Sequence, residues 1–157
     1  MRADRRMKGS TSVDVAADPD RIWRMIADVT QMGSWSPECV GCDWLDGASG
    51  PEPGARFRGH NRLGPFRWST TCTVEASDPG SEFAFVARHW TGATTRWRYT
   101  LEPAGAATRV TESYQALHTP GWMLALELAV RRGRTLDRSV HSTLERLRAA
   151  AERGAQR

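Results

Sequence analysis

The chain has 157 residues, of which 39% are hydrophobic, and it carries a formal net charge of +4 with a sequence pI near 9.5. A chain of this length can bury a core as one domain without disulfides or a metal. Its longest apolar run, 122–130, contains Glu127 and falls well short of the roughly 20 residues of a membrane-spanning helix, so we expect no stable membrane insertion. The basic segment 1–8 is not followed by the apolar stretch of a secretory signal, which predicts a cytoplasmic protein.

Two helical segments are predicted to follow a first strand. Alternation over 10–15 predicts the strand. Asp18 followed by Pro19 is typical of a helix start, and the apolar residues along 22–26 give this helix one buried face. A second short helix is predicted at 30–35, because it ends before a Ser-Pro pair that disfavours helical continuation.

From residue 38 onward the apolar residues recur with a period of two, which predicts antiparallel strands as far as 116. The first of them is expected to place Val40, Cys42 and Trp44 on one face. In the later strands aromatic residues alternate with arginines, so we expect the aromatic side chains to face inward and the arginines to face water. The residues assigned to the inward face are Phe57, Asn61, Trp68, Thr70, Phe85, Trp97, Tyr99, Glu112 and Tyr114.

The last part of the chain is predicted to form one continuous helix across the sheet, with Thr119 as a candidate N-cap. Position 133 is a glycine, which costs about 1 kcal/mol relative to alanine in a helix interior, so something has to offset the loss. Two explanations are open, namely a close approach of the helix backbone to the sheet, or space left for a ligand. The apolar stripe consists of Trp122, Leu126, Ala129, Gly133, Leu136, Val140, Leu144, Leu147 and Ala151.

This order of elements resembles the START-like superfamily, also called SRPBCC, and within it the polyketide cyclase/dehydrase group. The resemblance implies an α+β helix-grip fold, in which a curved antiparallel sheet of about seven strands, with two short helices after the first, wraps around a long C-terminal helix. It covers one domain at 10–153, and we expect 1–9 and 154–157 to be flexible tails. The segments that carry the resemblance are Asp18-Pro19 with Ile22-Trp23, Trp35-Ser36-Pro37, 54–57, 97–103 and 108–112.

The resemblance further implies an apolar cavity between the helix and the sheet. The inward residues agree with this, because large aromatic side chains mixed with a few polar groups are typical of small-molecule pockets. We therefore predict that the protein binds a hydrophobic small molecule, such as a lipid, polyketide or aromatic metabolite, for carriage, sensing or processing, without a cofactor. The predicted ligand-binding residues are Trp35, Phe57, Asn61, Trp68, Thr70, Phe85, Trp97, Tyr99, Glu112, Tyr114, Trp122, Leu126, Gly133, Leu136 and Val140.

Glu112 is the inward residue most open to chemistry, because a carboxylate on a buried face must find a partner or accept a raised pKa. In an enzyme of the aromatase/cyclase type, which is the alternative function, Glu112, Tyr114 and Asn61 are the candidate catalytic residues. The opposing interpretation places Glu112 near the open end of the sheet, paired with an arginine.

The cysteine and arginine patterns predict neither a metal site nor a nucleic-acid-binding surface. Cys39 and Cys42 have the spacing of half a zinc site, but no second pair follows and residues three apart on a strand point to opposite faces, so no metal is predicted. The odd number of cysteines fits a reducing compartment. Nucleic-acid binding is not expected, because the arginines and the aromatic residues fall on opposite faces.

The first half of the predicted terminal helix carries apolar residues beyond the main stripe. They predict a lid over the cavity or a homodimer contact, ahead of transient docking on a membrane surface, and they leave a protein-interaction module as a second alternative function. These residues are Met123, Leu124, Leu128 and Val130.

Overall fold

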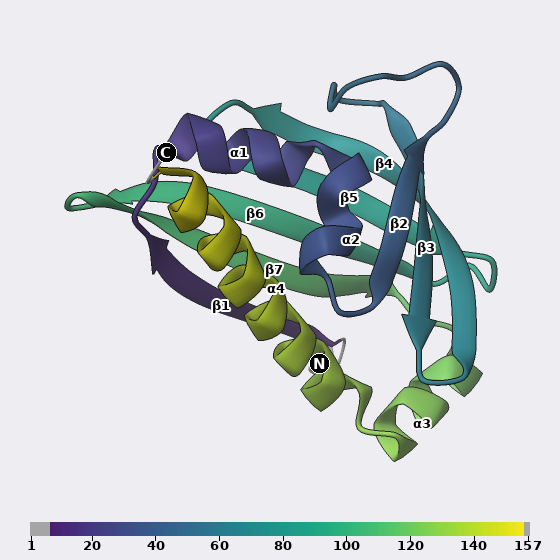
Figure 1. The fold of residues 1–157 in the computed structure, drawn as a ribbon. Helices are drawn as coiled ribbons and strands as arrows, with labels where there is room; N and C mark the ends of the chain where they lie inside the picture. The colour runs from purple at the N-terminus through teal and green to yellow at the C-terminus, as the bar shows by residue number, and fades with distance from the viewer. Residues whose placement is uncertain (1–6, 156–157) are drawn as a thin grey trace, which may run out of the picture.

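The computed structural model describes residues 7–155, which fold into a curved sheet with helices on its concave side (Figure 1). The fold is α+β and has the helix-grip arrangement that the sequence predicts. No helix in the described range is long and apolar enough to cross a membrane. In chain order the elements are β1 (Lys8–Val15), α1 (Pro19–Ala27), the 3-10 turn η1 (Val29–Gln31), α2 (Met32–Trp35), β2 (Cys39–Trp44), β3 (Arg56–Leu63), β4 (Phe66–Asp78), β5 (Glu82–His89), β6 (Thr94–Ala104), β7 (Ala107–His118), α3 (Gly121–Ala129) and α4 (Arg132–Ala155).

The strands form a single seven-stranded sheet in the order β1-β7-β6-β5-β4-β3-β2. Every neighbouring pair is antiparallel, and β1 closes on the last strand with Ser12 opposite Thr111. The predicted tails lie partly outside the described residues. Within the description, β1 already begins at Lys8 and α4 extends to Ala155.

The predicted helix start after β1 is confirmed. The Asp18 carboxylate accepts hydrogen bonds from two backbone N–H groups of the first turn of α1, at 2.8 and 3.3 Å. The indole Nε1 of Trp23 donates to the carbonyl oxygen of Glu82 at 2.8 Å, which ties α1 to β5. The helix predicted at 30–35 is divided into the 3-10 turn Val29–Gln31 and the short α2.

The first strand after these helices departs from the predicted facing. The pairing of β2 with β3 shifts register between Cys39 and Gly41, so Val40 bulges outward and is 62% exposed. Because the bulge interrupts the alternation, Cys39 and Cys42 are both buried in the core. The predictions that these cysteines point to opposite faces, and that Val40 shares a face with Trp44, are therefore wrong.

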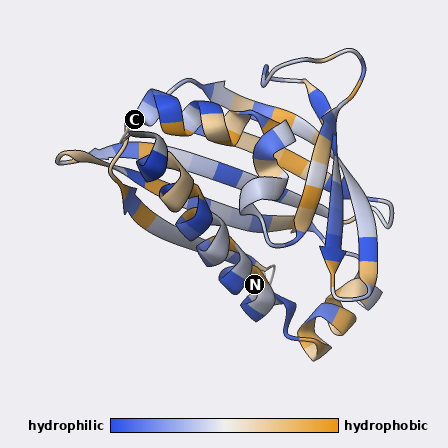
Figure 2. Ribbon diagram, in the orientation of Figure 1, coloured by the Kyte–Doolittle hydropathy of each residue, from blue (hydrophilic) through white to orange (hydrophobic). Residues whose placement is uncertain are grey.

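The predicted continuous C-terminal helix is interrupted between α3 and α4. Arg131 has a φ of 54°, in the left-handed region, which a right-handed helix cannot pass through. α3 buries none of its residues, and Figure 2 shows it as hydrophobic over much of its length. Its N-cap is Pro120 and makes no side-chain hydrogen bond, so the prediction of Thr119 as the cap is wrong.

The interruption divides the predicted apolar stripe into two parts. Trp122 and Leu126 lie on α3 and are 61% and 57% exposed. α4 packs along β1 and also contacts β7 (Figure 1). The buried stripe positions are those on α4, namely Leu136, Val140, Leu144, Leu147 and Ala151.

The middle of the sheet carries the inward residues in register. β6 and β7 place Tyr99 opposite Glu112 and Trp97 opposite Tyr114. β5 continues the second of these rows with Phe85 opposite Trp97. The alternation predicted from the sequence for these strands is confirmed, and it sets polar and aromatic side chains side by side beneath α4.

Candidate ligand-binding site

Glu112 stands out on β7 because its carboxyl group is buried without an opposite charge. The residue is 3% exposed. The hydroxyl of Tyr99, directly across on β6, donates a hydrogen bond to Oε1 at 2.8 Å. The other oxygen, Oε2, is buried and has no hydrogen-bond partner among residues 7–155. The interpretation of Glu112 as an arginine partner near the open end of the sheet is therefore wrong.

Burial controls the protonation of this pair. Loss of hydration raises the pKa of Glu112 from 4.5 to about 8, against a smaller lowering by the Tyr99 hydrogen bond. Burial, and then the charge of Glu112, raise the pKa of Tyr99 well above its usual value. At neutral pH Glu112 is therefore mainly the neutral acid. Its O–H group is a buried proton donor.

A second polar pair joins β7 to α4. The hydroxyl of Tyr114 donates to Oδ1 of Asp137 at 2.8 Å and lies 3.3 Å from the carbonyl oxygen of Gly133. Burial raises the pKa of Tyr114, and the hydrogen bond to Asp137 raises it further. The ring of Trp97 packs beside Tyr114, with the centroids 5.7 Å apart. Sequence reasoning missed Asp137, although it follows Gly133 by one helical turn and so shares its face.

A side chain at Gly133 would point into open space. A Cβ atom at this position would meet only the Sδ atom of Met7, at 4.0 Å. The explanation by close approach of the backbone to the sheet is therefore wrong. Neither of the two hollows described below is lined by Gly133, so space for a ligand at this position stays a prediction.

The apolar residues beneath α4 form two separate clusters. The smaller one contains Tyr114, Leu136 and Val140, with Met7 and Trp97 packed against it. The larger one is the main core, in which the rings of Phe57 and Phe85 pack edge to face with their centroids 5.1 Å apart. Of the predicted ligand-binding residues, the main core includes Trp35, Phe57, Phe85 and Tyr99.

Asn61, Trp68 and Thr70 lie toward the other edge of the sheet. Asn61 faces Trp68 across β3 and β4, and both line a hollow of about 470 Å³ at the start of β2. Thr70 is half-buried on β4. Strands β4, β5 and β6 separate Asn61 from the strand that carries Glu112 and Tyr114. Of the three predicted catalytic residues, the sheet thus places two on one strand and the third elsewhere.

An ion pair that the sequence did not indicate fixes the start of α4. The guanidinium of Arg132 donates two hydrogen bonds to the carboxylate of Glu38, at 2.5 and 2.7 Å, and the two side chains are 17% and 11% exposed. The same guanidinium lies over the indole of Trp68, 5.8 Å from the ring centroid. The partners are 94 positions apart, so no local pattern could have paired them.

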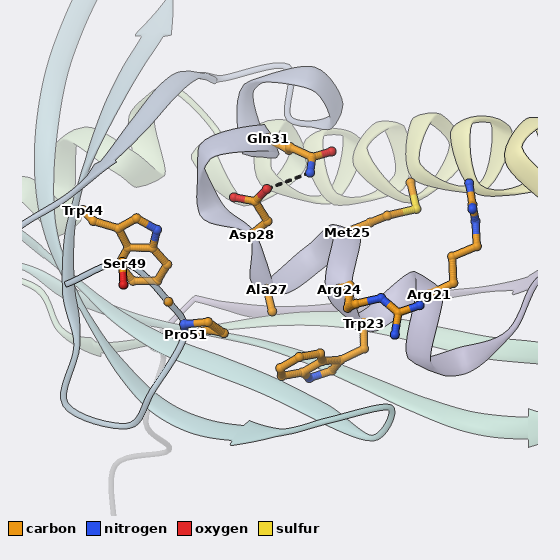
Figure 3. A pocket seen from close by; sticks show the side chains of 11 residues that line it. Arg21, Trp23, Arg24, Met25, Ala27, Asp28, Gln31, Trp44, Ser49 and Pro51 are labelled. Atoms are coloured by element: carbon orange, nitrogen blue, oxygen red, sulfur yellow. Dashed lines mark hydrogen bonds between the residues drawn. The ribbon is translucent and has the colours of Figure 1, made fainter.

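A second hollow, of about 490 Å³, lies between α1 and the loop that follows β2 (Figure 3). Trp23, Arg24 and Met25 line it from α1, and Trp44 and Pro51 line the opposite wall. Sequence reasoning had assigned no site here, because these residues come from two separate segments without a shared period.

Comparisons with known proteins agree with this fold. The family model described as polyketide cyclase / dehydrase and lipid transport matches residues 6–152. The di-domain ARO/CYC StfQ from the steffimycin biosynthetic pathway has a TM-score of 0.77 at 13% identity, over 97% of this chain and 52% of StfQ. The Polyketide_cyc-like protein Cgl2372 from Corynebacterium glutamicum has a TM-score of 0.60 at 24% identity, over 98% of this chain and 94% of that protein.

Protein MLL2253 from Mesorhizobium loti has a TM-score of 0.70 at 14% identity, over 93% of this chain and 97% of that protein. No curated protein matches the chain. Structural likeness at these identities speaks for the fold alone. The family model, in contrast, spans nearly the whole sequence and all of the elements from β1 into α4. The chain therefore belongs to the polyketide cyclase/dehydrase and lipid transport family of the SRPBCC superfamily.

Proposed function

We propose that the protein binds a hydrophobic small molecule that carries a carbonyl oxygen, between the concave face of the sheet and α4, for carriage, sensing or processing. The observation that carries this proposal is the buried carboxyl group of Glu112, whose Oε2 has no partner among residues 7–155. An unsatisfied buried polar group costs about 1 to 3 kcal/mol. A ligand oxygen that accepts a hydrogen bond from the Glu112 carboxyl group removes this cost.

The surroundings of Glu112 support a ligand that is otherwise apolar, such as a lipid, a polyketide or an aromatic metabolite. Trp97, Leu136 and Val140 supply apolar surface near Tyr114, and Gly133 leaves room beside it. Family membership favours a hydrophobic ligand as well. We place the protein in the cytoplasm, where its three free cysteines stay reduced.

A cyclase-type enzyme is the second candidate, favoured by the protonation of Glu112. A carboxyl group whose pKa is raised to about 8 is poised to give or take a proton near neutral pH. In this role the neutral acid protonates a ligand carbonyl oxygen while the carbon of an enol in the same poly-keto chain adds to that carbonyl. The hydroxyl of Tyr99 hydrogen-bonds the carboxylate that forms, and the enol O–H, which becomes a carbonyl, returns its proton to this carboxylate.

We also propose a homodimer through α3, because its apolar side chains have no cover in the described residues. Leu126→Glu should convert a dimer to a monomer in analytical ultracentrifugation. Arg153→Glu, which changes an exposed side chain near the end of α4, is the control and should not. A wild-type monomer at micromolar concentration would reject this contact and leave α3 as a lid.

Binding is tested first by native mass spectrometry of freshly purified protein, which should show a mass above that of the polypeptide. Added ligands should change tryptophan fluorescence and raise the melting temperature by mass action. The panel pairs each carbonyl compound with the matching hydrocarbon. If no fatty acid, sterol, flavonoid or polycyclic aromatic compound gives either response, the proposal fails.

The role of Glu112 is tested with Glu112→Leu, which removes the proton donor but keeps an apolar side chain of similar size. It should weaken the carbonyl ligand roughly 3- to 10-fold, the value of one hydrogen bond, and leave the hydrocarbon unchanged. The control is Glu75→Leu, because Glu75 pairs with Arg96 at the surface. Equal loss for both ligands would mean that Glu112 shapes the site without recognising the carbonyl.

Glu112→Gln separates the two candidate functions, because glutamine still donates a hydrogen bond but cannot transfer a proton. A carrier should keep its affinity within a few fold and return the ligand unchanged. An enzyme should lose turnover of a poly-keto substrate and keep its binding.

A further inference from the structure

Three sulfur atoms meet beneath α2, away from the Glu112 site. The Sγ atoms of Cys39 and Cys42 are 3.4 Å apart, and the Sδ atom of Met32 lies 3.9 Å from the Sγ of Cys42. Both cysteines are buried and free. The bulge at Val40 creates this cluster, because a regular strand would send the two thiols to opposite faces.

The backbone holds the three ligating positions in place. The hydroxyl oxygen of Ser36 accepts a hydrogen bond from the backbone N–H of Cys39 at 3.0 Å. Cys42 lies opposite Gly59 in the β2–β3 ladder, and Met32 begins α2. The ligands therefore come from two elements, α2 and β2, and the cluster does not depend on one mobile loop.

The chemistry of this cluster points to a soft monovalent metal. Thiolate and thioether sulfur favour Cu(I), whereas harder metal ions prefer imidazole or carboxylate ligands. Three sulfurs around one metal, at metal–sulfur distances of about 2.3 Å, lie about 4 Å from one another in a planar arrangement. The Met32–Cys42 distance already has this value, and the two thiols need to separate by about 0.6 Å.

We propose that Met32, Cys39 and Cys42 form a binding site for Cu(I). Binding replaces the thiol protons of both cysteines, so two protons leave as one cation enters and the site becomes singly negative. Residues 7–155 contain no group of three His, Cys, Asp or Glu side chains that could hold a metal. The thioether of Met32 is thus what completes the ligand set, and it disfavours zinc.

The protonation of the cysteine pair agrees with this exchange. The hydrogen bond from Cys42 lowers the pKa of Cys39, and the same contact raises the pKa of Cys42. Cys39 is therefore the first of the two thiols to lose its proton, and Cys42 loses its proton as the metal binds.

A hollow lies near the cluster at the start of β2. It has a volume of about 470 Å³, and Val40 and Asn61 line it. Val40 follows Cys39 in the chain, and Asn61 is the partner of Cys39 in the β2–β3 ladder, so the hollow is bordered by two neighbours of this cysteine.

The test uses the reduced full chain under anaerobic conditions, with Cu(I) supplied as its acetonitrile complex in competition with a chromophoric Cu(I) chelator. The expected result is one Cu(I) per chain, with sulfur as the only ligand in X-ray absorption. Cys39→Ser and Cys42→Ser should each weaken binding by more than the roughly 10- to 100-fold that losing an outer-sphere contact costs. Cys72→Ser is the matched control, because Cys72 is also buried and free, and it should bind like the wild type.

Met32→Leu keeps the volume of the side chain and removes only the thioether, so it remains informative if the serine variants fail to fold. It should weaken Cu(I) roughly 10-fold and change the fitted coordination from three sulfurs to two. Three results would each overturn the site. They are a wild-type affinity for Cu(I) in either serine variant, an equal loss of Cu(I) affinity in Cys72→Ser, and nitrogen or oxygen ligands in the X-ray absorption spectrum. Binding of the organic ligand should be the same with and without Cu(I), so this test is independent of the function proposed above.

Discussion

The C-terminal half of α4 buries Leu144, Leu147 and Ala151 in the main core, whereas the N-terminal half meets the sheet through the smaller cluster around Tyr114 and has open space at Gly133. The first contact is apolar and closely packed. The second includes polar pairs, an uncharged buried acid and an open position on the helix. One helix thus holds the fold together at one end and leaves the other end adaptable, which is the arrangement that a binding protein requires.

The polar groups beneath the N-terminal half of α4 should make the stability of the protein depend on pH. Glu112 has a pKa of about 8 in the folded protein against 4.5 for an ordinary glutamate, so between these values the folded state holds a proton that the unfolded chain has released. Stability is therefore highest below about pH 4.5 on account of this group and falls as the pH rises toward 8. At about 1.4 kcal/mol per pKa unit, the loss is on the order of 4 kcal/mol. Urea unfolding of the wild type and Glu112→Gln at several pH values measures it.

Subtracting the free energy of unfolding of Glu112→Gln from that of the wild type removes the contributions of the other titrating groups, which the two proteins share. Glu112→Gln should match the wild type near pH 4.5 and exceed it at pH 8. A difference that stays constant with pH would mean that Glu112 is not kept neutral by burial.

The packed end should be the more sensitive to truncation. Leu144→Ala removes a fully buried side chain and should lower the free energy of unfolding by about 3 to 4 kcal/mol. Leu136→Ala, at the adaptable end, should cost about 2 kcal/mol, because the space beside Gly133 lets the site relax. Equal losses in chemical denaturation would erase the distinction between the two halves.

The Glu38–Arg132 pair should stabilise the junction between the adaptable end and the sheet edge. Glu38→Gln or Arg132→Met alone should lower stability by about 2 kcal/mol, because each leaves a mostly buried charge without its partner. The double variant should recover part of this loss, which a double-mutant cycle measures. Single-variant effects below about 0.5 kcal/mol would show that the pair behaves like an exposed ion pair.

The smallest effect is expected at Gly133. Gly133→Ala should raise the free energy of unfolding by up to about 1 kcal/mol, because alanine favours the helix and its Cβ meets open space. Gly9→Ala is the contrast, since its Cβ would lie 2.6 Å from both Asp137 Oδ1 and the ring of Tyr114. It should destabilise the protein. A loss of stability in Gly133→Ala would indicate a contact that closes the space beneath the helix.

The strand alternation and the element order could be predicted from the sequence, because repeated patterns of aromatic and charged residues leave one consistent facing for the sheet. Glu112 was found for the same reason, since its parity places it inward. The bulge at Val40 could not be predicted, because one inserted residue leaves both flanking patterns intact. The break at Arg131 was equally hidden, since Arg131 and Arg132 are good helix formers and the apolar stripe runs on through Gly133 without a shift in its spacing.

The candidate site was predictable only where its residues share an element. Glu112 and Tyr114 lie on one strand, so their common parity was visible. Asp137 and Arg132 act through contacts with distant segments, and neither stands out locally among the charged residues of α4. One of the two interpretations paired Glu112 with an arginine, whereas the cross-strand register places Tyr99 opposite Glu112.

The pairing of β1 with β7 has a consequence for how the protein is made. Ser12 and Thr111 share a hydrogen bond between their hydroxyl groups and are 99 positions apart. At synthesis rates of about 5 to 20 residues per second, β1 waits about 5 to 20 seconds on the ribosome before its partner strand is made. During that time its backbone donors and acceptors are open to other strands, including those of neighbouring nascent chains. The yield of folded protein should therefore depend on translation speed and on chaperones that cover this first strand.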